Sequence, residues 1–224
     1  MDVTWKCQGR GNDAMRLAVV RVITGLLVLA GFGGCSVLPK PEPVALDQYV
    51  LEYTPNQVAT DSVDDVPVLI ITAPRAHGGY DTPRIAYLKQ AFSLRYYTRS
   101  RWADTPARML VPLAADAMQA TGQFQALYAT PGSIAADYRL DTELIRFHQD
   151  FTRQPSVMHI TLRARLVDLR ESRVVGAQQF DIIEPAATED SYGGVVAANK
   201  AVSLLLDELA LFCVSGIDTA HSRR

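Results

Sequence analysis

The clearest alternation of hydrophobic and polar positions lies in the second half of the chain. Over residues 158–166 every even position is apolar, and most odd positions are polar or basic. A period of two predicts a strand with one buried face. The surrounding segment 136–184, with a turn at Glu171-Ser172, therefore predicts a three-stranded antiparallel meander. The apolar parity changes near Leu144, which predicts a bulge there.

Two segments have the period of a helix instead. The first begins at Thr105, a capping residue followed by Pro106, carries apolar residues at i, i+3, i+4 and i+7, and ends at Gly122. The second has a continuous apolar seam over residues 192–214, and Gly216 is expected to end it.

Shorter apolar segments before the first helix predict four more strands. They are expected at residues 49–54, 66–72, 84–89 and 92–98. The order of elements predicts an α+β fold, with a mostly antiparallel sheet and two helices packed on one face. One domain is expected over residues 47–214, followed by a flexible tail at 215–224.

Composition narrows the class of protein without giving an activity. The chain has 224 residues, of which 48% are hydrophobic and 21% charged, as in ordinary globular proteins. The net charge of −2 argues against a nucleic-acid binder held by bulk charge. Three cysteines cannot form a disulfide framework, and a single apolar run excludes a transporter with many membrane spans.

That apolar run lies near the N-terminus and is preceded by basic residues. It extends from Val22 to Phe32 and is followed by two glycines, which is the layout of a secretory signal peptide. The run is too short to span a bilayer comfortably. Residues 1–34 are therefore predicted to be a signal peptide, and Met15 gives a more typical start than Met1.

The segment from Leu29 to Cys35 resembles the lipobox of bacterial lipoproteins, with Phe32 where the pattern usually has Leu. The resemblance implies cleavage before Cys35 and acylation of its sulfur and its new amino group. Ser36 after the cysteine implies transfer to the outer membrane, facing the periplasm. The alternative is an ordinary cleaved signal peptide followed by an unmodified cysteine.

The residues after Cys35 have the composition of an extended stalk. Pro39, Pro41 and Pro43 alternate with charged residues in the segment 35–46, which favours polyproline II and forbids a helix. At ~3.1 Å per residue, residues 36–46 reach at most roughly 34 Å. A plain N-terminal linker is the simpler interpretation of the same residues.

No known arrangement of catalytic or metal-binding residues is present. The four histidines show no i, i+4 pair, although His148 and His159 flank one hairpin and could approach each other. The motifs GxSxG, GxGxxG and the phosphate-binding P-loop are missing. These observations predict a protein that is not an enzyme, with no cofactor and no metal ion.

The remaining candidate groups have simpler explanations. Cys213 is expected to be a buried small hydrophobic residue. The acidic pairs Asp64-Asp65 and Glu189-Asp190 are expected to be solvated loop charges. Four arginines could form a basic patch for lipid headgroups or a partner, although a polar sheet face balanced by acidic residues is the simpler interpretation. They are Arg99, Arg101, Arg163 and Arg165.

The run that begins RIAYLKQAFSLRYYTRSRWADTP resembles the ABC-type transport auxiliary lipoprotein family, the PqiC-like proteins. The resemblance covers roughly residues 47–213 and rests on the order of several short motifs. The residues that carry it are Tyr96, Tyr97, Trp102, Ala103, Pro106, Gly122, Phe124, Asn199 and Ala201.

The resemblance implies a non-catalytic accessory of an MCE-type ABC system that moves lipids or other apolar compounds between the two membranes. Its partners would be an MCE-domain protein, the ABC permease and ATPase, and outer-membrane lipid through the acyl anchor. Tyr96, Tyr97 and Trp102 are candidate partner contacts, because aromatic residues near loops often anchor interfaces; core packing is the alternative. A lipid carrier with its own apolar cavity and an enzyme with an unfamiliar site remain as rival functions.

Overall fold

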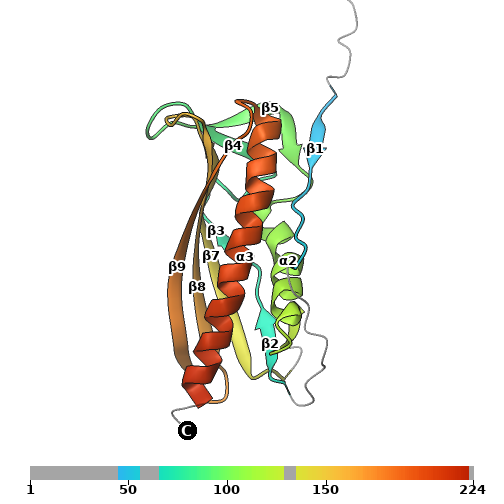
Figure 1. The fold of residues 1–224 in the computed structure, drawn as a ribbon, viewed down its shortest axis with the longest axis vertical. Coiled ribbons are helices and arrows are strands. Elements are labelled where there is room, and N and C mark those ends of the chain that lie inside the picture. The colour runs from blue at the N-terminus through green and yellow to red at the C-terminus, as the bar shows by residue number, and fades with distance from the viewer. Residues whose placement is uncertain (1–44, 56–65, 129–134, 222–224) are drawn as a thin grey trace, which may run out of the picture. The chain divides into compact units, whose positions relative to one another are not determined.

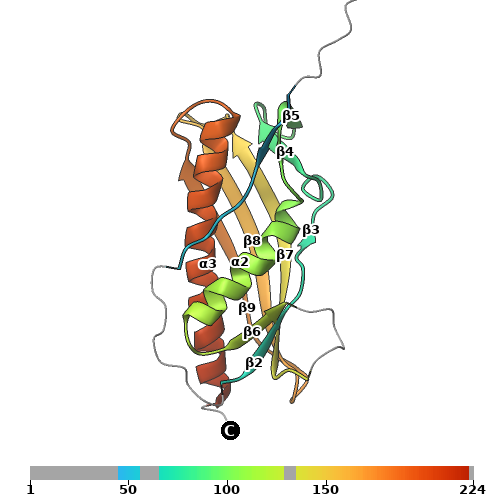
Figure 2. The same ribbon diagram turned by 90° about the vertical axis from the view of Figure 1, so that its right-hand side faces the viewer.

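A computed structural model describes residues 45–55, 66–128 and 135–221 of the chain. These residues form a nine-stranded sheet with two helices, α2 (Pro106–Ala120) and α3 (Ser191–His221), on the same face (Figures 1 and 2). The α+β class and the placement of the helices are as predicted. Neither helix in the described part of the chain combines the length and apolar character needed to cross a membrane. The predicted signal peptide, Cys35 and stalk residues 36–44 lie outside the described residues.

The predicted meander is present and provides the longest strands. It consists of β7 (Tyr138–Asp150), β8 (Val157–Asp168) and β9 (Arg173–Pro185), each antiparallel to the next. The register of β7 against β8 shifts between Leu144 and Arg146, which confirms the predicted bulge. Because these ladders are long, the sheet is mostly antiparallel.

The other edge of β7 pairs with three short strands in succession, all of them parallel to it. They are β2 (Val68–Ile71), β3 (Arg75–Ala76) and β4 (Arg84–Leu88). Beyond them, β6 (Gln125–Tyr128) is parallel to β2, β5 (Leu94–Trp102) is antiparallel to β4, and β1 (Asp47–Tyr49) is parallel to β5. Local sequence patterns predicted neither β3 nor these parallel pairings.

The first predicted helix has the expected ends. Helix α2 spans Pro106–Ala120, and the Thr105 hydroxyl accepts a hydrogen bond from the Arg108 amide at 3.4 Å. Gly122 follows with φ of 67°, a left-handed conformation that glycine adopts without strain. The buried alanines of α2, among them Ala114 and Ala117, allow this helix to pack closely.

Helix α3 (Ser191–His221) is longer than predicted, and the expected end at Gly216 is wrong. A Cβ atom at Gly216 would lie 2.9 Å from Leu166 of β8, so this glycine permits close packing of the helix on the sheet. Ile217 is buried beyond it, which explains why the helix continues. Residues 215–221, expected to be a flexible tail, are therefore helical.

The segment predicted as the first strand packs mostly on α3 instead. Only residues 47–49 pair with the sheet. The following segment is held by Asn199, whose Oδ1 accepts from the Glu52 amide at 2.7 Å and whose Nδ2 donates to the Val50 carbonyl at 3.3 Å. The hydroxyl of Tyr53 donates to Asp207 at 2.7 Å. The alternating pattern of this segment thus reflects packing against a helix and not pairing in the sheet.

The start of α3 is fixed by a carboxylate that the sequence suggested was a solvated loop charge. Asp190 Oδ1 accepts from the Gly193 amide at 2.7 Å and from the Thr188 hydroxyl at 2.8 Å. These hydrogen bonds hold the pKa of Asp190 below its usual value. Glu189 accepts from the Ser156 amide at 2.9 Å, so both carboxylates have structural roles. Asp64 and Asp65 lie outside the described residues.

We predict that Gly193→Ala destabilises the domain. The added Cβ would lie 2.1 Å from the Thr188 carbonyl oxygen and 2.8 Å from its amide nitrogen, and backbone atoms cannot turn aside as a side chain can. The free energy of unfolding should fall by on the order of 2 kcal/mol in a denaturant titration. Gly78→Ala is the control, because a Cβ there meets nothing within 4 Å. Equal stability of the two variants would contradict this account of the helix start.

Candidate functional site

Trp102, a candidate partner contact, lies at the end of β5 with only 1% of its surface exposed. Its ring packs edge-on against Phe147 of β7, with 5.6 Å between the ring centroids. The structure therefore favours core packing for Trp102, since the residue has almost no surface to offer to a partner.

Tyr96 and Tyr97 are half-buried, and both use their hydroxyl groups within the domain. The Tyr97 hydroxyl donates to Gln149 Oε1 at 2.9 Å, and burial raises the pKa of this phenol. The Tyr96 hydroxyl donates to the Gly79 carbonyl at 3.0 Å, and the Arg84 guanidinium lies 3.9 Å from its ring centroid. Tyr96 thus holds the loop before β4, and Tyr97 joins β5 to β7.

Among the residues whose exposure the structure describes, the exposed aromatic ones are Phe92 and Tyr192. Phe92 was expected in a strand, but it lies in the turn before β5, where the Ser93 amide donates to the Gln90 carbonyl at 3.1 Å. Its φ is 65° and its side chain is fully exposed. Tyr192, in the first turn of α3, is 60% exposed, and its ring centroid lies 6.2 Å from that of Tyr49.

The β4–β5 turn and the start of α3 lie at the same end of the domain (Figures 1 and 2). We call this the aromatic end, defined by Phe92 and Tyr192. The sequence indicates that Tyr192 is exposed, because this residue falls outside the apolar seam of its helix. No sequence signal indicates the exposure of Phe92, because its alternation with Leu94 and Tyr96 resembles that of a strand.

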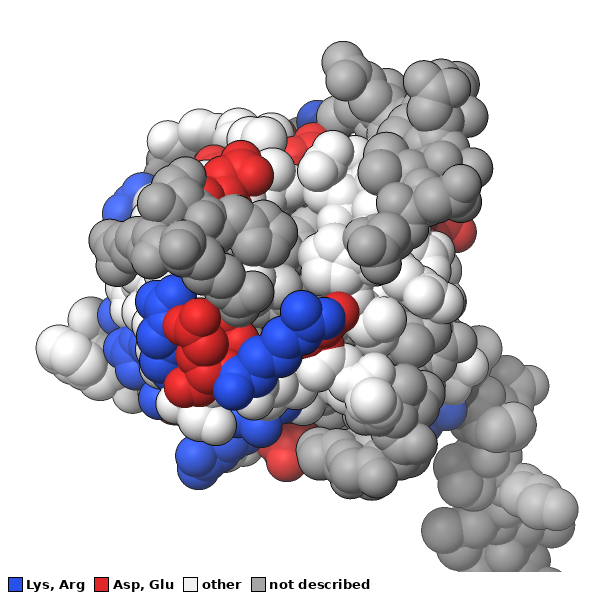
Figure 3. All heavy atoms as spheres, turned by 90° about the horizontal axis from the view of Figure 1, so that it is seen from below, with Lys and Arg blue, Asp and Glu red and all other residues white. Residues whose placement is uncertain are grey.

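The opposite end of the domain has a different character. Figure 3 shows basic and acidic side chains next to one another on this end. Arg170 forms an ion pair with Asp137, and Arg173 forms one with Glu171 in the turn between β8 and β9. Exposed pairs of this kind contribute little to stability, about 0–1 kcal/mol each.

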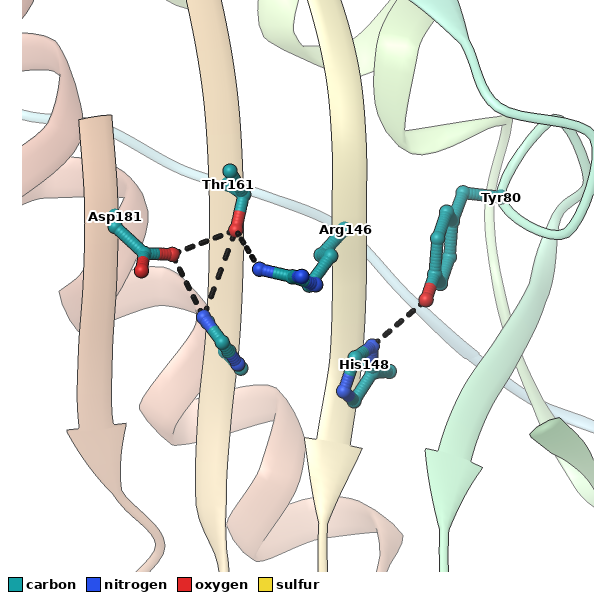
Figure 4. A network of polar contacts seen from close by, with 6 residues as sticks. Tyr80, Arg146, His148, Thr161 and Asp181 are labelled. Carbon is teal, nitrogen blue, oxygen red and sulfur yellow. Dashed lines mark hydrogen bonds and ion pairs between the residues drawn. The ribbon is translucent and has the colours of Figure 1, made fainter. Parts of the chain in front are cut away.

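The sheet face away from the helices carries a polar network across three strands (Figure 4). Asp181 of β9 accepts from the Thr161 hydroxyl at 2.6 Å and lies 2.7 Å from Nε2 of His159, both on β8. Arg146 of β7 donates to the Thr161 oxygen at 3.4 Å. Burial raises the pKa of Asp181, but these hydrogen bonds outweigh it and lower the pKa overall.

His148 lies on the same face and is buried, as Thr161 is. It pairs directly with His159 across β7 and β8, with 5.7 Å between ring centroids, so the two histidines do approach each other. The Tyr80 hydroxyl lies 2.9 Å from its Nδ1. Burial, together with the neighbouring charge of His159, lowers the pKa of His148 to about 4. Within the described ranges, no group of three or more His, Cys, Asp and Glu residues is placed to hold a metal ion.

The four arginines proposed as a patch do not lie together. Arg99 and Arg101 are on β5, whereas Arg163 and Arg165 are on β8, and β4 and β7 separate these strands in the sheet. Cys213 is fully buried as predicted, and burial raises the pKa of its thiol to about 12.

An apolar cavity lies between the two helices and the sheet. Its lining includes Leu110 of α2, Leu206 of α3 and Leu140 of β7, and its volume of about 10 Å³ is room for one water-sized sphere. A lipid acyl chain does not fit into this cavity as the structure has it.

Comparison with known proteins identifies the relatives of this fold. The family model described as "ABC-type transport auxiliary lipoprotein component" matches residues 49–210. The chain belongs to this family. A crystal structure of protein XCC0632 from Xanthomonas campestris superposes with a TM-score of 0.68 at 22% identity, covering 78% of this chain and 99% of that one. Another, of an uncharacterized protein, has a TM-score of 0.59 at 11% identity, covering 74% and 97%. No curated protein gives a significant match.

Membership of the transport auxiliary family makes the chain a lipoprotein component of an ABC transport system, anchored to a membrane toward the periplasm. The residues that carried the family resemblance have structural roles. Trp102 is in the core, Pro106 starts α2, Gly122 ends it, and Asn199 holds the segment after β1. These four residues of the signature therefore support the fold of this auxiliary protein.

We predict that His148 makes the stability of this auxiliary protein depend on pH. The unfolded chain has the ordinary histidine pKa of 6.5, whereas the folded protein holds it at about 4. Between these values only the unfolded state binds the proton, so the free energy of unfolding falls as pH decreases. From pH 7.5 to 5.0 the loss should be about 2 kcal/mol.

His148→Gln should remove this part of the pH dependence in urea unfolding curves measured at the two pH values. His77→Gln, which changes an exposed histidine, is the matched control and should keep the steep profile. Identical slopes for wild type and His148→Gln would show that another group titrates in this range.

Proposed function

We propose that this chain is an outer-membrane lipoprotein that acts as a non-catalytic accessory of an MCE-type ABC system. The system would move lipids or other apolar compounds between the two membranes. The family match over residues 49–210 is the observation that carries the proposal, because it links the whole folded domain to ABC-type transport. The partners would be an MCE-domain protein and the permease and ATPase of that system.

The expected anchor at Cys35 supports the cellular location. A cysteine with two or three acyl chains binds a bilayer stably, whereas a single chain would be marginal. Residue 36 is serine, which in bacterial lipoproteins accompanies sorting to the outer membrane. The stalk residues 36–46 would then place the domain within roughly 34 Å of that membrane.

The geometry favours an accessory over a lipid carrier. A carrier needs an apolar cavity that encloses an acyl chain, and the cavity between α2, α3 and the sheet has about 10 Å³. The aromatic end instead offers two exposed rings, and exposed aromatic residues commonly anchor partner proteins. We infer that the aromatic end contacts the MCE-domain protein, because its rings are exposed, whereas Tyr96 and Tyr97 are half-buried and Trp102 is buried.

Cys35→Ser should abolish acylation and leave the signal peptide uncleaved. Mass spectrometry of the purified chain measures both effects, and membrane fractionation should show loss from the outer membrane. Cys213→Ala is the control and should leave processing unchanged, because Cys213 is buried within the domain. Unchanged processing and fractionation of Cys35→Ser would exclude the lipid anchor.

The combined variant Phe92→Gly and Tyr192→Ala should reduce recovery of the MCE-domain protein from solubilised envelopes by about tenfold or more. The full-length chain is the bait, and the MCE-domain protein is quantified by mass spectrometry. Glycine adopts the φ of residue 92 without strain, so Phe92→Gly should not lower the stability of the domain.

Leu211→Ala is the matched control, because it removes an exposed apolar side chain from α3 far from the aromatic end. Recovery should be unaffected by this control. If wild type fails to recover an MCE-domain protein, the proposed partnership is wrong. If the double variant recovers it as well as wild type does, the contact surface lies elsewhere.

A further inference from the structure

A groove lies on the polar face of the sheet, between the end of β2 and the beginning of β3. Strand β2 pairs with β7 up to Leu140, and β3 resumes the pairing at Glu143. Three residues, Thr72 to Pro74, connect the two strands and leave the edge of β7 unpaired beside Asp141 and Thr142. The resulting cavity has a volume of about 230 Å³.

The charged side chains that line the groove come from three strands. Arg75 is on β3, Asp141 and Glu143 are on β7, and Arg163 and Arg165 are on β8. The cross-strand register places Glu143 opposite Arg163 and Asp141 opposite Arg165. Residues far apart in the sequence thus place three guanidinium groups around one hollow.

Both carboxylates of the groove already have cationic partners. Asp141 accepts two hydrogen bonds from Arg139, at 2.8 and 2.9 Å. Glu143 accepts from Arg163 at 2.9 Å and lies 3.2 Å from Nε2 of His77. The hydrogen bond from His77 and the charges of Arg163 and Arg75 keep the pKa of Glu143 below its usual value, so this carboxylate stays ionised.

Arg75 and Arg165 are left without such a partner. Neither forms an ion pair with any residue of the described ranges, although Arg165 lies directly opposite Asp141. Among the described residues, the lining has three arginines and two carboxylates, and Arg139 pairs with Asp141 from outside the lining, so two positive charges remain unbalanced. Both unpaired arginines are exposed, so their donors are accessible to a ligand.

We propose that this groove binds the phosphate group of an anionic ligand, with Arg75 and Arg165 as its principal donors. The planar fork of an arginine side chain matches the oxygens of a phosphate and forms paired, charge-assisted hydrogen bonds with them. The volume is smaller than the about 300–1,000 Å³ of sites for drug-sized molecules, which suits a headgroup-sized anion. A free phosphate and the headgroup of a phospholipid share this chemistry.

The purified full-length chain in neutral detergent should bind both inorganic phosphate and dioctanoyl phosphatidylglycerol in isothermal titration calorimetry. Dioctanoylglycerol, which has the same acyl chains without the phosphate, should not bind. The double variant Arg75→Gln, Arg165→Gln should weaken binding by at least about tenfold, since it removes two charge-assisted contacts. Arg99→Gln, which changes an exposed arginine of β5, is the control and should bind as wild type does.

Binding of both probes would assign the groove to the phosphate group itself. Binding of the phospholipid alone would identify a headgroup site, and binding of inorganic phosphate alone a site for soluble anions. Absence of saturable binding by either probe, or equal binding by the double variant, overturns the proposal. Because the assay contains only this chain, a negative binding result would not contradict the proposed transport partnership. Thermal unfolding of each variant confirms that it is folded.

Discussion

The structure depends on the pairing of β7 along both of its edges. One edge forms a continuous antiparallel ladder with β8, and the other is divided among β2, β3 and β4. Every other strand except β1 pairs with β7 or with one of its direct neighbours. Helix α3 covers β8 and β9, which β7 joins to the rest of the sheet. The division of the second edge also creates the groove, which lies where one short strand stops before the next begins.

The sequence predicted the meander and both helices because their signals are local. Apolar alternation in 158–166 and the cap at Thr105 require no knowledge of distant residues. Strand β3 and the parallel pairings were not predicted, because a strand of two residues carries no periodicity and the partners of a parallel pair lie far apart along the chain. Gly216 shows how packing overrides a local rule, since its missing side chain admits Leu166 and the helix continues.

The candidate site residues also differ in whether a local sequence signal could predict them. Cys35 was found from a short contiguous motif, although it lies outside the described residues. Aromatic residue type alone did not separate the buried Trp102 from the exposed Phe92, because exposure depends on which residues the fold places next to each ring. The arginines of the groove could not be grouped from the sequence, since Arg75 and Arg165 meet only when β3 and β8 align on β7.

The attachment of β1 has a mechanical consequence. Tension on the chain ahead of residue 45 would act along β1, which lies parallel to β5 and is followed by the segment fixed to Asn199 and Asp207. Hydrogen bonds loaded along a strand share the force, whereas those at the end of an opening hairpin break one after another. Loss of the three-residue β1–β5 pairing would therefore not by itself release the chain, because the segment after β1 stays bonded to α3.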